Sequence, residues 1–322
     1  MTCAAFALSL SAFGMAVGGP ALAKLGARTV AITIDDLPLA GVDEAAPGTP
    51  TKAEMLAVNR DLLRGLKSHG AAATGFVVQS RVDSAGDTGL AILRRWLAEG
   101  FDLGNHTFSH ADFNRLDIAT EEAEVARGER SFLPMMRAAG RQPLFFRFPM
   151  NHTGDTPAKH DAMQRFLARR GYRLAVCTID TEDYLFSRAY DAARGAHDAT
   201  LAAKVKRAYL DYTDKEIDYY AELGRKVLGY EPPEVMLLHA NRLNADAVDE
   251  ILRLFERRNY RFVTLAEAEA DPAYAVPDTL ATPYGMMWGC RWARELKVPV
   301  DGRLETEPPD WIVKAAEGAA SD

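Results

Sequence analysis

Acidic, basic and imidazole side chains follow most of the predicted strands of this chain. Asp35 and Asp36 end the first strand, and later strands are followed by His106, Arg147, Asp180, Asp183 and His239. In parallel α/β folds, residues beyond the carboxyl ends of the strands meet on one face, where ligands bind. One such residue alone is often a helix cap or a turn former. Their repetition at the same end of the strands predicts a shared polar site.

His106 and His110 have the types and spacing of metal ligands. One helical turn between them would place both imidazoles on the same side, and Asp36 could add a carboxylate. Two histidines, one carboxylate and an open position for water form an ordinary catalytic zinc site. Two surface histidines are the alternative, and the Asp35-Asp36 pair upstream favours the metal. We expect Zn²⁺ first, while Co²⁺, Ni²⁺ or Mn²⁺ also suits nitrogen and oxygen ligands.

Alternating strand and helix patterns must position these side chains. Apolar, β-branched runs predict seven strands, over residues 28–34, 73–78, 101–104, 144–148, 172–179, 235–238 and 260–265. Helical spacing of apolar residues predicts helices over 53–68, 90–98, 119–139, 161–170 and 245–258, with a kink or an end at Pro134. The alternation predicts an α/β fold with a parallel sheet, either closed as a barrel or open.

Two segments do not follow this alternation. Residues 181–230 form a predicted helical insertion, and seven of the eleven tyrosines lie within 184–230. These tyrosines either form an aromatic surface over the site or, as we favour, pack the insertion onto the barrel. Residues 271–322 hold six prolines and three of the four tryptophans, which predicts an irregular C-terminal tail packed on the barrel.

The first 23 residues have the features of a signal peptide. They carry no charge, include an apolar run over 4–17 and end in Ala21-Leu22-Ala23, a small-x-small cleavage site. A buried helix or a membrane anchor is the alternative, although a spanning helix needs ~20 apolar residues. Cleavage would leave a barrel over 24–270 and the tail over 271–322. We expect this protein to be exported, to the periplasm or beyond, without a stable membrane span.

The composition narrows the classes of partner. Lys and Arg total 38 against 45 Asp and Glu, so the net charge is −7. Without a basic block, nucleic acid is not an expected partner. Three cysteines exclude a disulfide scaffold and a cysteine-rich zinc module. Whether Cys177 and Cys290 pair stays open, as does the oligomeric state, and His69, His160 and His197 are expected on the surface.

The motifs resemble those of the NodB-homology polysaccharide deacetylases, carbohydrate esterase family four, from Ile32 to about Leu265. Five segments carry the resemblance: Ile32-Thr33-Ile34-Asp35-Asp36, Asn105-His106-Thr107-Phe108-Ser109-His110, Arg147-Phe148-Pro149-Met150, Asp180-Thr181-Glu182-Asp183-Tyr184 and Leu237-Leu238-His239. The resemblance implies a distorted (β/α)7 barrel. It also implies hydrolysis of N-acetyl, or O-acetyl, groups of a glycan by a metal-activated water.

The resemblance further implies a role for each motif residue. Asp35 would be the catalytic base, held in place by Arg147. His239 would be the general acid, oriented by Asp183. The implied metal ligands are Asp36, His106 and His110.

The substrate-binding positions that the resemblance implies are Pro149, Met150, Tyr184 and Leu237. Met150 stands where the family has tyrosine, and its backbone N–H would still donate to an oxyanion. Tyr184 replaces a tryptophan and forms a smaller wall of the acetyl pocket, beside Leu237. Leu37 stands where the family commonly has glycine, so the loop after the first strand differs in shape.

Two other functions fit parts of the same pattern. Some NodB-like relatives hydrolyse small cyclic amides, often with altered metal residues, whereas Asp36, His106 and His110 are all present here. A glycan-binding relative without catalysis would be expected to lose the base or the acid, and both Asp35 and His239 are retained. The sequence does not identify the acetylated glycan.

Overall fold

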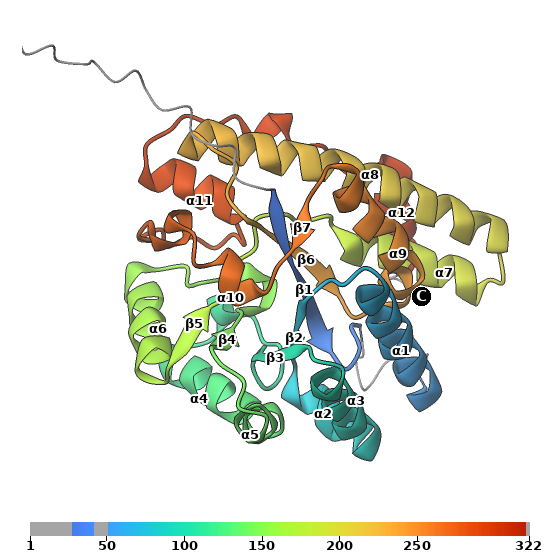
Figure 1. Ribbon diagram of the computed structural model, residues 1–322, viewed down its shortest axis with the longest axis horizontal. Helices are drawn as coiled ribbons and strands as arrows, with labels where there is room; N and C mark the ends of the chain where they lie inside the picture. Colours follow the sequence, from blue (N-terminus) through green and yellow to red (C-terminus); the bar gives the residue numbers. More distant parts are fainter. Residues whose placement is uncertain (1–27, 42–50, 320–322) are drawn as a thin grey trace, which may run out of the picture.

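Seven parallel strands form one sheet in the computed structural model, which describes residues 28–41 and 51–319 (Figure 1). The strands are β1 (Thr29–Leu37), β2 (Ala73–Val77), β3 (Asp102–Asn105), β4 (Leu144–Phe146), β5 (Tyr172–Leu174), β6 (Glu234–His239) and β7 (Arg261–Phe262). Their order is β5-β4-β3-β2-β1-β6, and β7 pairs with the start of β1. All nine residues of β1 are buried, as its nearly continuous apolar run predicts. The predicted strands and the α/β class are confirmed.

The segment that follows β5 joins both edges of the sheet. The Ala175 N–H donates to the Phe146 carbonyl of β4 at 2.7 Å. Farther along, Ile179 forms a parallel bridge with Met236 of β6, and the Leu237 N–H donates to the Ile179 carbonyl at 3.0 Å. The sheet therefore curls back on itself, in agreement with the expected distorted barrel.

Helices cover the sheet close to their predicted positions. They are α1 (Lys52–Ser68), α2 (Gln79–Ala85), α3 (Asp87–Ala98), α4 (Ile118–Gly128), α5 (Phe132–Ala138), α6 (Pro157–Arg169), α9 (Arg242–Arg257) and α10 (Leu265–Ala268). Helices α2 and α10 were not predicted, because α2 begins directly after β2 and α10 is only four residues long. The helix predicted over 119–139 is two helices, and Pro134 lies in the first turn of α5, where its missing N–H costs no helical hydrogen bond.

The insertion consists of α7 (Asp183–Gly195) and α8 (Ala199–Leu228), which runs along one side of the molecule (Figure 1). Tyr209 and Tyr212 are buried, and their rings contact Phe186 at centroid distances of 5.3 and 5.4 Å. The Tyr209 hydroxyl donates to Asn244 Oδ1 of α9 at 2.8 Å. Tyr209 therefore joins the insertion to α9, as the favoured interpretation expects, whereas Tyr184 and Tyr230 are 44% and 41% exposed.

The C-terminal tail is less irregular than predicted, because it contains α11 (Trp288–Glu295) and α12 (Asp310–Ala319). Helix α11 packs on α8, and α12 packs on α7 (Figure 1). Trp288 and Trp292 are both buried, since a spacing of four residues places them on one face of α11. The six prolines of the tail led to the prediction of irregular structure, although they lie outside α11 and α12.

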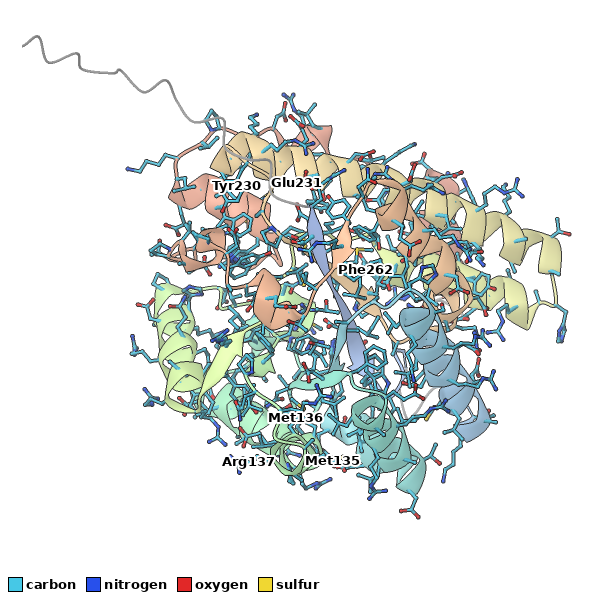
Figure 2. All side chains as sticks on the ribbon, viewed as in Figure 1. Met135, Met136, Arg137, Tyr230, Glu231 and Phe262 are labelled. Carbon is cyan, nitrogen blue, oxygen red and sulfur yellow. The ribbon has the colours of Figure 1, made fainter. Side chains whose placement is uncertain are left out.

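Side chains fill the space between the sheet and its helices (Figure 2). Met136 of α5 is fully buried, and its sulfur accepts a hydrogen bond from the Leu103 N–H of β3 at 3.4 Å. The surface position predicted for His160 is wrong, because its side chain is 1% exposed. Its ring nitrogens lie 3.1 Å from the Thr153 carbonyl and 2.9 Å from that of Asp278. The Thr153 carbonyl can accept from the Nδ1–H, and the Gln164 amide, 2.7 Å from Nε2, can donate to that nitrogen, so the buried imidazole has partners on both sides.

Two predictions concern the export of the chain. The predicted signal peptide over 1–23 lies outside the described residues, so export stays a prediction. Within 28–41 and 51–319, no helix combines the length and apolar character needed to cross a bilayer.

Cys177 is buried, and both it and Cys290 are free thiols.

Candidate active site

The carboxyl ends of β1, β3 and β6 bring the predicted polar residues to one edge of the sheet. Asp35 in β1 lies in register with His239 in β6, and the His106 N–H donates to the Val77 carbonyl of β2 at 3.0 Å. Successive strand residues normally point to opposite faces. Asp36 departs from this pattern with a φ of 72°, a left-handed conformation that Asp tolerates better than most residues. Both carboxylates therefore reach the same histidine.

Asp36, His106 and His110 each offer one ligand atom, and these atoms lie within 4.8 Å of one another. Asp36 Oδ1 is 3.4 Å from His110 Nε2 and 3.9 Å from His106 Nε2. This oxygen is buried, it forms no hydrogen bond among the described residues, and the Arg81 guanidinium lies 2.7 Å from it. Two imidazoles and one carboxylate fit a divalent metal ion with a position left for water or substrate.

The loop that carries both histidines is not a helical turn, so that part of the prediction is wrong. No helix lies between His106 and Asp112, and Thr107 and His110 have φ angles of 68° and 60°. The His110 N–H donates to Thr107 Oγ1 at 3.0 Å. A tight turn therefore brings the two imidazole rings to a centroid distance of 5.0 Å.

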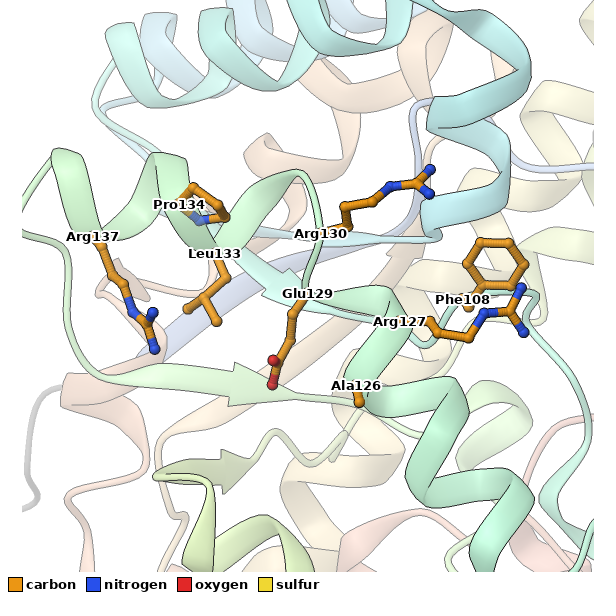
Figure 3. Close-up of a pocket in the computed structure, with 8 residues that line it drawn as sticks. All are labelled: Phe108, Ala126, Arg127, Glu129, Arg130, Leu133, Pro134 and Arg137. Atoms are coloured by element: carbon orange, nitrogen blue, oxygen red, sulfur yellow. The ribbon is translucent and has the colours of Figure 1, made fainter.

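Helix α4 holds this loop from the outside. The Glu124 side chain is buried, and its Oε2 accepts hydrogen bonds from the Ser109 N–H and the Ser109 hydroxyl, both at 2.7 Å. One turn later, the Arg127 guanidinium lies 3.5 Å from the centre of the Phe108 ring (Figure 3). The two residues between Thr107 and His110 are thus both fixed by α4.

Hydrogen bonding and burial prepare the two histidines to bind as neutral ligands. His106 Nδ1 lies 2.9 Å from the Arg147 carbonyl, which directs Nε2 to the carboxylates. Burial lowers the pKa of His106, and it lowers the pKa of His110 to about 4. Both rings are therefore neutral near pH 7, which is the form that binds a metal.

Arg147 holds Asp35 in one position. Its Nη1 donates to Asp35 Oδ1 at 2.7 Å, while its other nitrogens donate to the carbonyls of Ala175 and Val176. Arg147 is 1% exposed and Asp35 is 3% exposed, so solvent screens this pair little. Asp35 Oδ2 remains directed toward His106 Nε2, at 3.6 Å. That oxygen is placed to accept a proton.

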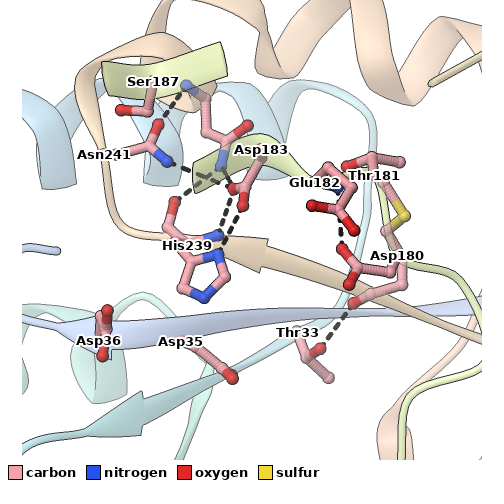
Figure 4. A network of polar contacts seen from close by, with 12 residues as sticks. Thr33, Asp35, Asp36, Asp180, Thr181, Glu182, Asp183, Ser187, His239 and Asn241 are labelled. Atoms are coloured by element: carbon pink, nitrogen blue, oxygen red, sulfur yellow. Dashed lines mark hydrogen bonds and ion pairs between the residues drawn. The ribbon is translucent and has the colours of Figure 1, made fainter. Parts of the chain in front are cut away.

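His239 and Asp183 form the second charged pair (Figure 4). His239 Nδ1 lies 2.6 Å from Asp183 Oδ1, and the His239 N–H donates to Asp183 Oδ2 at 2.8 Å. Burial acts to lower the pKa of His239, but Asp183 outweighs it and raises this pKa to about 10. For Asp183, burial acts to raise the pKa, and His239 overcomes this and holds it below its usual value. His239 is therefore protonated at neutral pH.

The four predicted substrate-binding residues differ in accessibility. Met150 is 47% exposed with a φ of 53°, and Tyr184, in the first turn of α7, is 44% exposed. Pro149 is buried, and Leu237 in β6 is 5% exposed. Met150 and Tyr184 can contact a ligand directly as the structure stands. The substrate roles of all four stay predictions.

Arg81 is a site residue that the sequence did not point to. It lies in the first turn of α2, and its Nη1 is 2.7 Å from Asp36 Oδ1. Burial acts to raise the pKa of Asp36, but Arg81 and the nearby histidines outweigh it and hold this pKa below its usual range. No motif marks an arginine at this position, and α2 itself was not predicted.

Comparisons with known proteins give the following similarities. The family model described as polysaccharide deacetylase matches residues 23–168. A chitin deacetylase from Pestalotiopsis sp is 30% identical over 157 residues, which is 49% of this chain and 44% of the relative. The peptidoglycan-N-acetylmuramic acid deacetylase PdaC from Bacillus subtilis is 24% identical over 242 residues, 75% of this chain and 39% of that protein. The chain thus spans less than half the length of these curated relatives.

Among solved structures, a carbohydrate esterase family 4 pseudoenzyme from Bacillus anthracis is similar with a TM-score of 0.49 and 16% identity. The similarity covers 76% of this chain and 66% of that one.

Proposed function

Because residues 23–168 match the polysaccharide deacetylase model and the chain is similar to two curated deacetylases, we propose that it is a metal-dependent hydrolase that removes acetyl groups from a glycan. The observation that carries the proposal is a convergence at one edge of the sheet. Three candidate metal ligands lie beside a buried carboxylate–guanidinium pair and a carboxylate–imidazole pair. Such a site offers a base, an acid and an electrophile together.

Asp36, His106 and His110 would hold the metal ion. Bound there, a divalent ion supplies a Lewis acid for the acetyl carbonyl and a bound water with a lowered pKa. We propose Zn²⁺ as the resident ion, and Co²⁺, Ni²⁺ or Mn²⁺ suits the same nitrogen and oxygen donors.

Asp35 and His239 would move the protons. Asp35 Oδ2 takes a proton from the attacking water, while Arg147 keeps Oδ1 in place. When the bond between the acyl carbon and the leaving nitrogen or oxygen breaks, His239 gives its proton to the amine or alkoxide. Asp183 stabilises the imidazolium before this transfer. The products are acetate and a free amine or hydroxyl on the glycan.

The substrate class that we propose is an acetylated glycan. This substrate class is supported by two relatives, which are a chitin deacetylase and a peptidoglycan-N-acetylmuramic acid deacetylase. We further propose that the protein acts after export, where such polymers lie.

Acetate release tests the proposal. Purified protein loaded with Zn²⁺ or Co²⁺ is assayed on acetylated chitooligosaccharides, on peptidoglycan, on an O-acetylated glycan and on small cyclic amides. Asp35→Asn and His239→Ala should each lower the rate by about 10²–10⁴-fold. Asp102→Asn is the control, because Asp102 begins β3 at the opposite end of the sheet.

The outcomes separate the candidate functions. Hydrolysis confined to the cyclic amides would support the small-amide alternative, and glycan binding without acetate release would indicate a non-catalytic relative. Wild-type turnover in Asp35→Asn would overturn the proposed mechanism.

A further inference from the structure

One oxygen of Asp36 faces two imidazoles and a guanidinium. Arg81 Nη1 lies 2.7 Å from Asp36 Oδ1, and the same oxygen is 3.4 Å from His110 Nε2 and 3.9 Å from His106 Nε2. The Arg81 side chain is 13% exposed and that of Asp36 is 8% exposed. Solvent therefore screens this contact only weakly.

The contact between Arg81 and Asp36 is one of charge rather than of directed hydrogen bonding. Neither Arg81 Nη1 nor Asp36 Oδ1 has a hydrogen-bond partner among the described residues, and both atoms are buried. Within 28–41 and 51–319, Asp36 is the one carboxylate that forms an ion pair with Arg81. Because a guanidinium keeps its proton in proteins, a permanent cation lies against the oxygen that faces both predicted histidine ligands.

We propose that Arg81 is a positioning residue that limits how tightly Asp36, His106 and His110 bind a divalent cation. The inference rests on the metal site of the proposed function. With neutral ligand histidines, the charges of Arg81 and Asp36 cancel, as do those of the Arg147–Asp35 and His239–Asp183 pairs, so the site carries no net charge before the ion binds. A site without Arg81 would carry one negative charge and would not repel the incoming ion.

The expected size of the effect follows from outer-shell residues in general, which change metal affinity by about 10–100-fold. Such residues usually strengthen binding by orienting a ligand. Here the contact lacks the geometry of a hydrogen bond, so the orienting contribution is small and the repulsion between cations decides the sign. Removing the charge should tighten binding.

Zn²⁺ affinity measured by competition with a chromophoric chelator tests the inference, with the absorption spectrum of bound Co²⁺ as a second readout. Arg81→Met should bind Zn²⁺ about 10–100-fold more tightly than wild type, whereas Arg81→Lys, which keeps a charge, should stay close to wild type. Arg242→Met is the matched control. Arg242 is similarly buried, at 11% exposed, and pairs with Asp61 and Asp246.

Equal or weaker Zn²⁺ binding by a folded Arg81→Met protein would overturn the inference. If that variant does not fold, Arg81→Gln is compared with Arg81→Lys in the same assay, and equal affinities would overturn it. Tighter binding by Arg81→Met, in a protein whose wild type releases no acetate, would support the inference and overturn the proposed activity. The two proposals can therefore fail separately.

Discussion

Replacing Asp183 with asparagine tests the charged pair that it forms with His239. Asp183 is 1% exposed, and it accepts the His239 ring N–H at 2.6 Å and the backbone N–H at 2.8 Å. Asparagine has nearly the same shape but no charge, and with its Oδ1 accepting from Asn241 and Asn244 its amide hydrogens would face His239 Nδ1. We expect the pKa of His239 to fall well below about 10, because Asp183 makes the largest contribution that raises it and burial acts in the opposite direction.

The loss of stability follows from the same contacts. A hydrogen bond to a charged group contributes about 1.5–3 kcal/mol, and two such bonds join His239 to Asp183. Breaking a buried pair by removing one partner costs about 3–5 kcal/mol, in agreement with the sum of the two bonds. Urea denaturation at pH 7 should show a loss of this size in Asp183→Asn.

The raised pKa of His239 also fixes how the stability depends on pH. A group whose pKa is higher in the folded state contributes fully below its unfolded pKa, which for histidine is about 6.5. The contribution is lost as the pH rises through about 10. Wild-type stability should therefore decline between these values, and the Asp183→Asn protein should lack that decline.

An NMR titration of the His239 ring in metal-free protein measures the pKa directly. Asp246→Asn is the matched control, because it removes a 2.6 Å ion pair with Arg242 and should leave the His239 pKa unchanged. A wild-type His239 that titrates near 6.5 would refute the reasoning. Wild-type pH dependence in Asp183→Asn would refute it equally.

Arg147→Met should cost about 3–5 kcal/mol in urea denaturation, because it leaves Asp35 buried without its partner; a near-wild-type midpoint would contradict this. Glu124→Ala should weaken Zn²⁺ binding about 10–100-fold in chelator competition, since Ser109 loses both bonds that hold the histidine loop. Glu121→Gln should leave that affinity unchanged and raise the free energy of unfolding. Burial raises the pKa of Glu121 to about 8. The wild type therefore loses stability as the pH rises from about 4.5 to about 8, because the buried Glu121 ionises. The glutamine variant should show its full gain in stability above about pH 8. Unchanged zinc affinity in Glu124→Ala would contradict the role given to the bonds with Ser109. Easier unfolding of Glu121→Gln than of wild type at pH 9 would contradict the cost given to burying Glu121.

The strands and the edge of the sheet that carries the site could be predicted because their signals are local. Apolar runs mark buried parallel strands, and residues after such strands share one edge. The spacing of His106 and His110 was misleading, because four residues span a helical turn or a tight loop equally well. The positive φ angles of Thr107 and His110 show that these residues form a tight loop rather than a helical turn.

Arg81 and Glu124 could not be predicted, because each acts through a partner on another element. Arg81 is 45 residues from Asp36, and Glu124 is 15 residues from Ser109. Charged residues in helices are most often solvated, and periodicity alone does not show which of them turn toward a loop. Only the packing of α2 and α4 against the sheet decides these contacts.

Strand β1 lies between β2 and β6 in the sheet, yet it is made early during synthesis. Its partner in β6 comes much later, since Val30 pairs with Glu234. Ribosomes add about 5–20 residues per second, so one edge of this apolar strand stays unpaired for roughly 10 s or more. Fragments that stop before Glu234 should therefore aggregate. The same late strand carries His239, so a nascent chain that stops before β6 lacks both this strand pairing and the partner of Asp183.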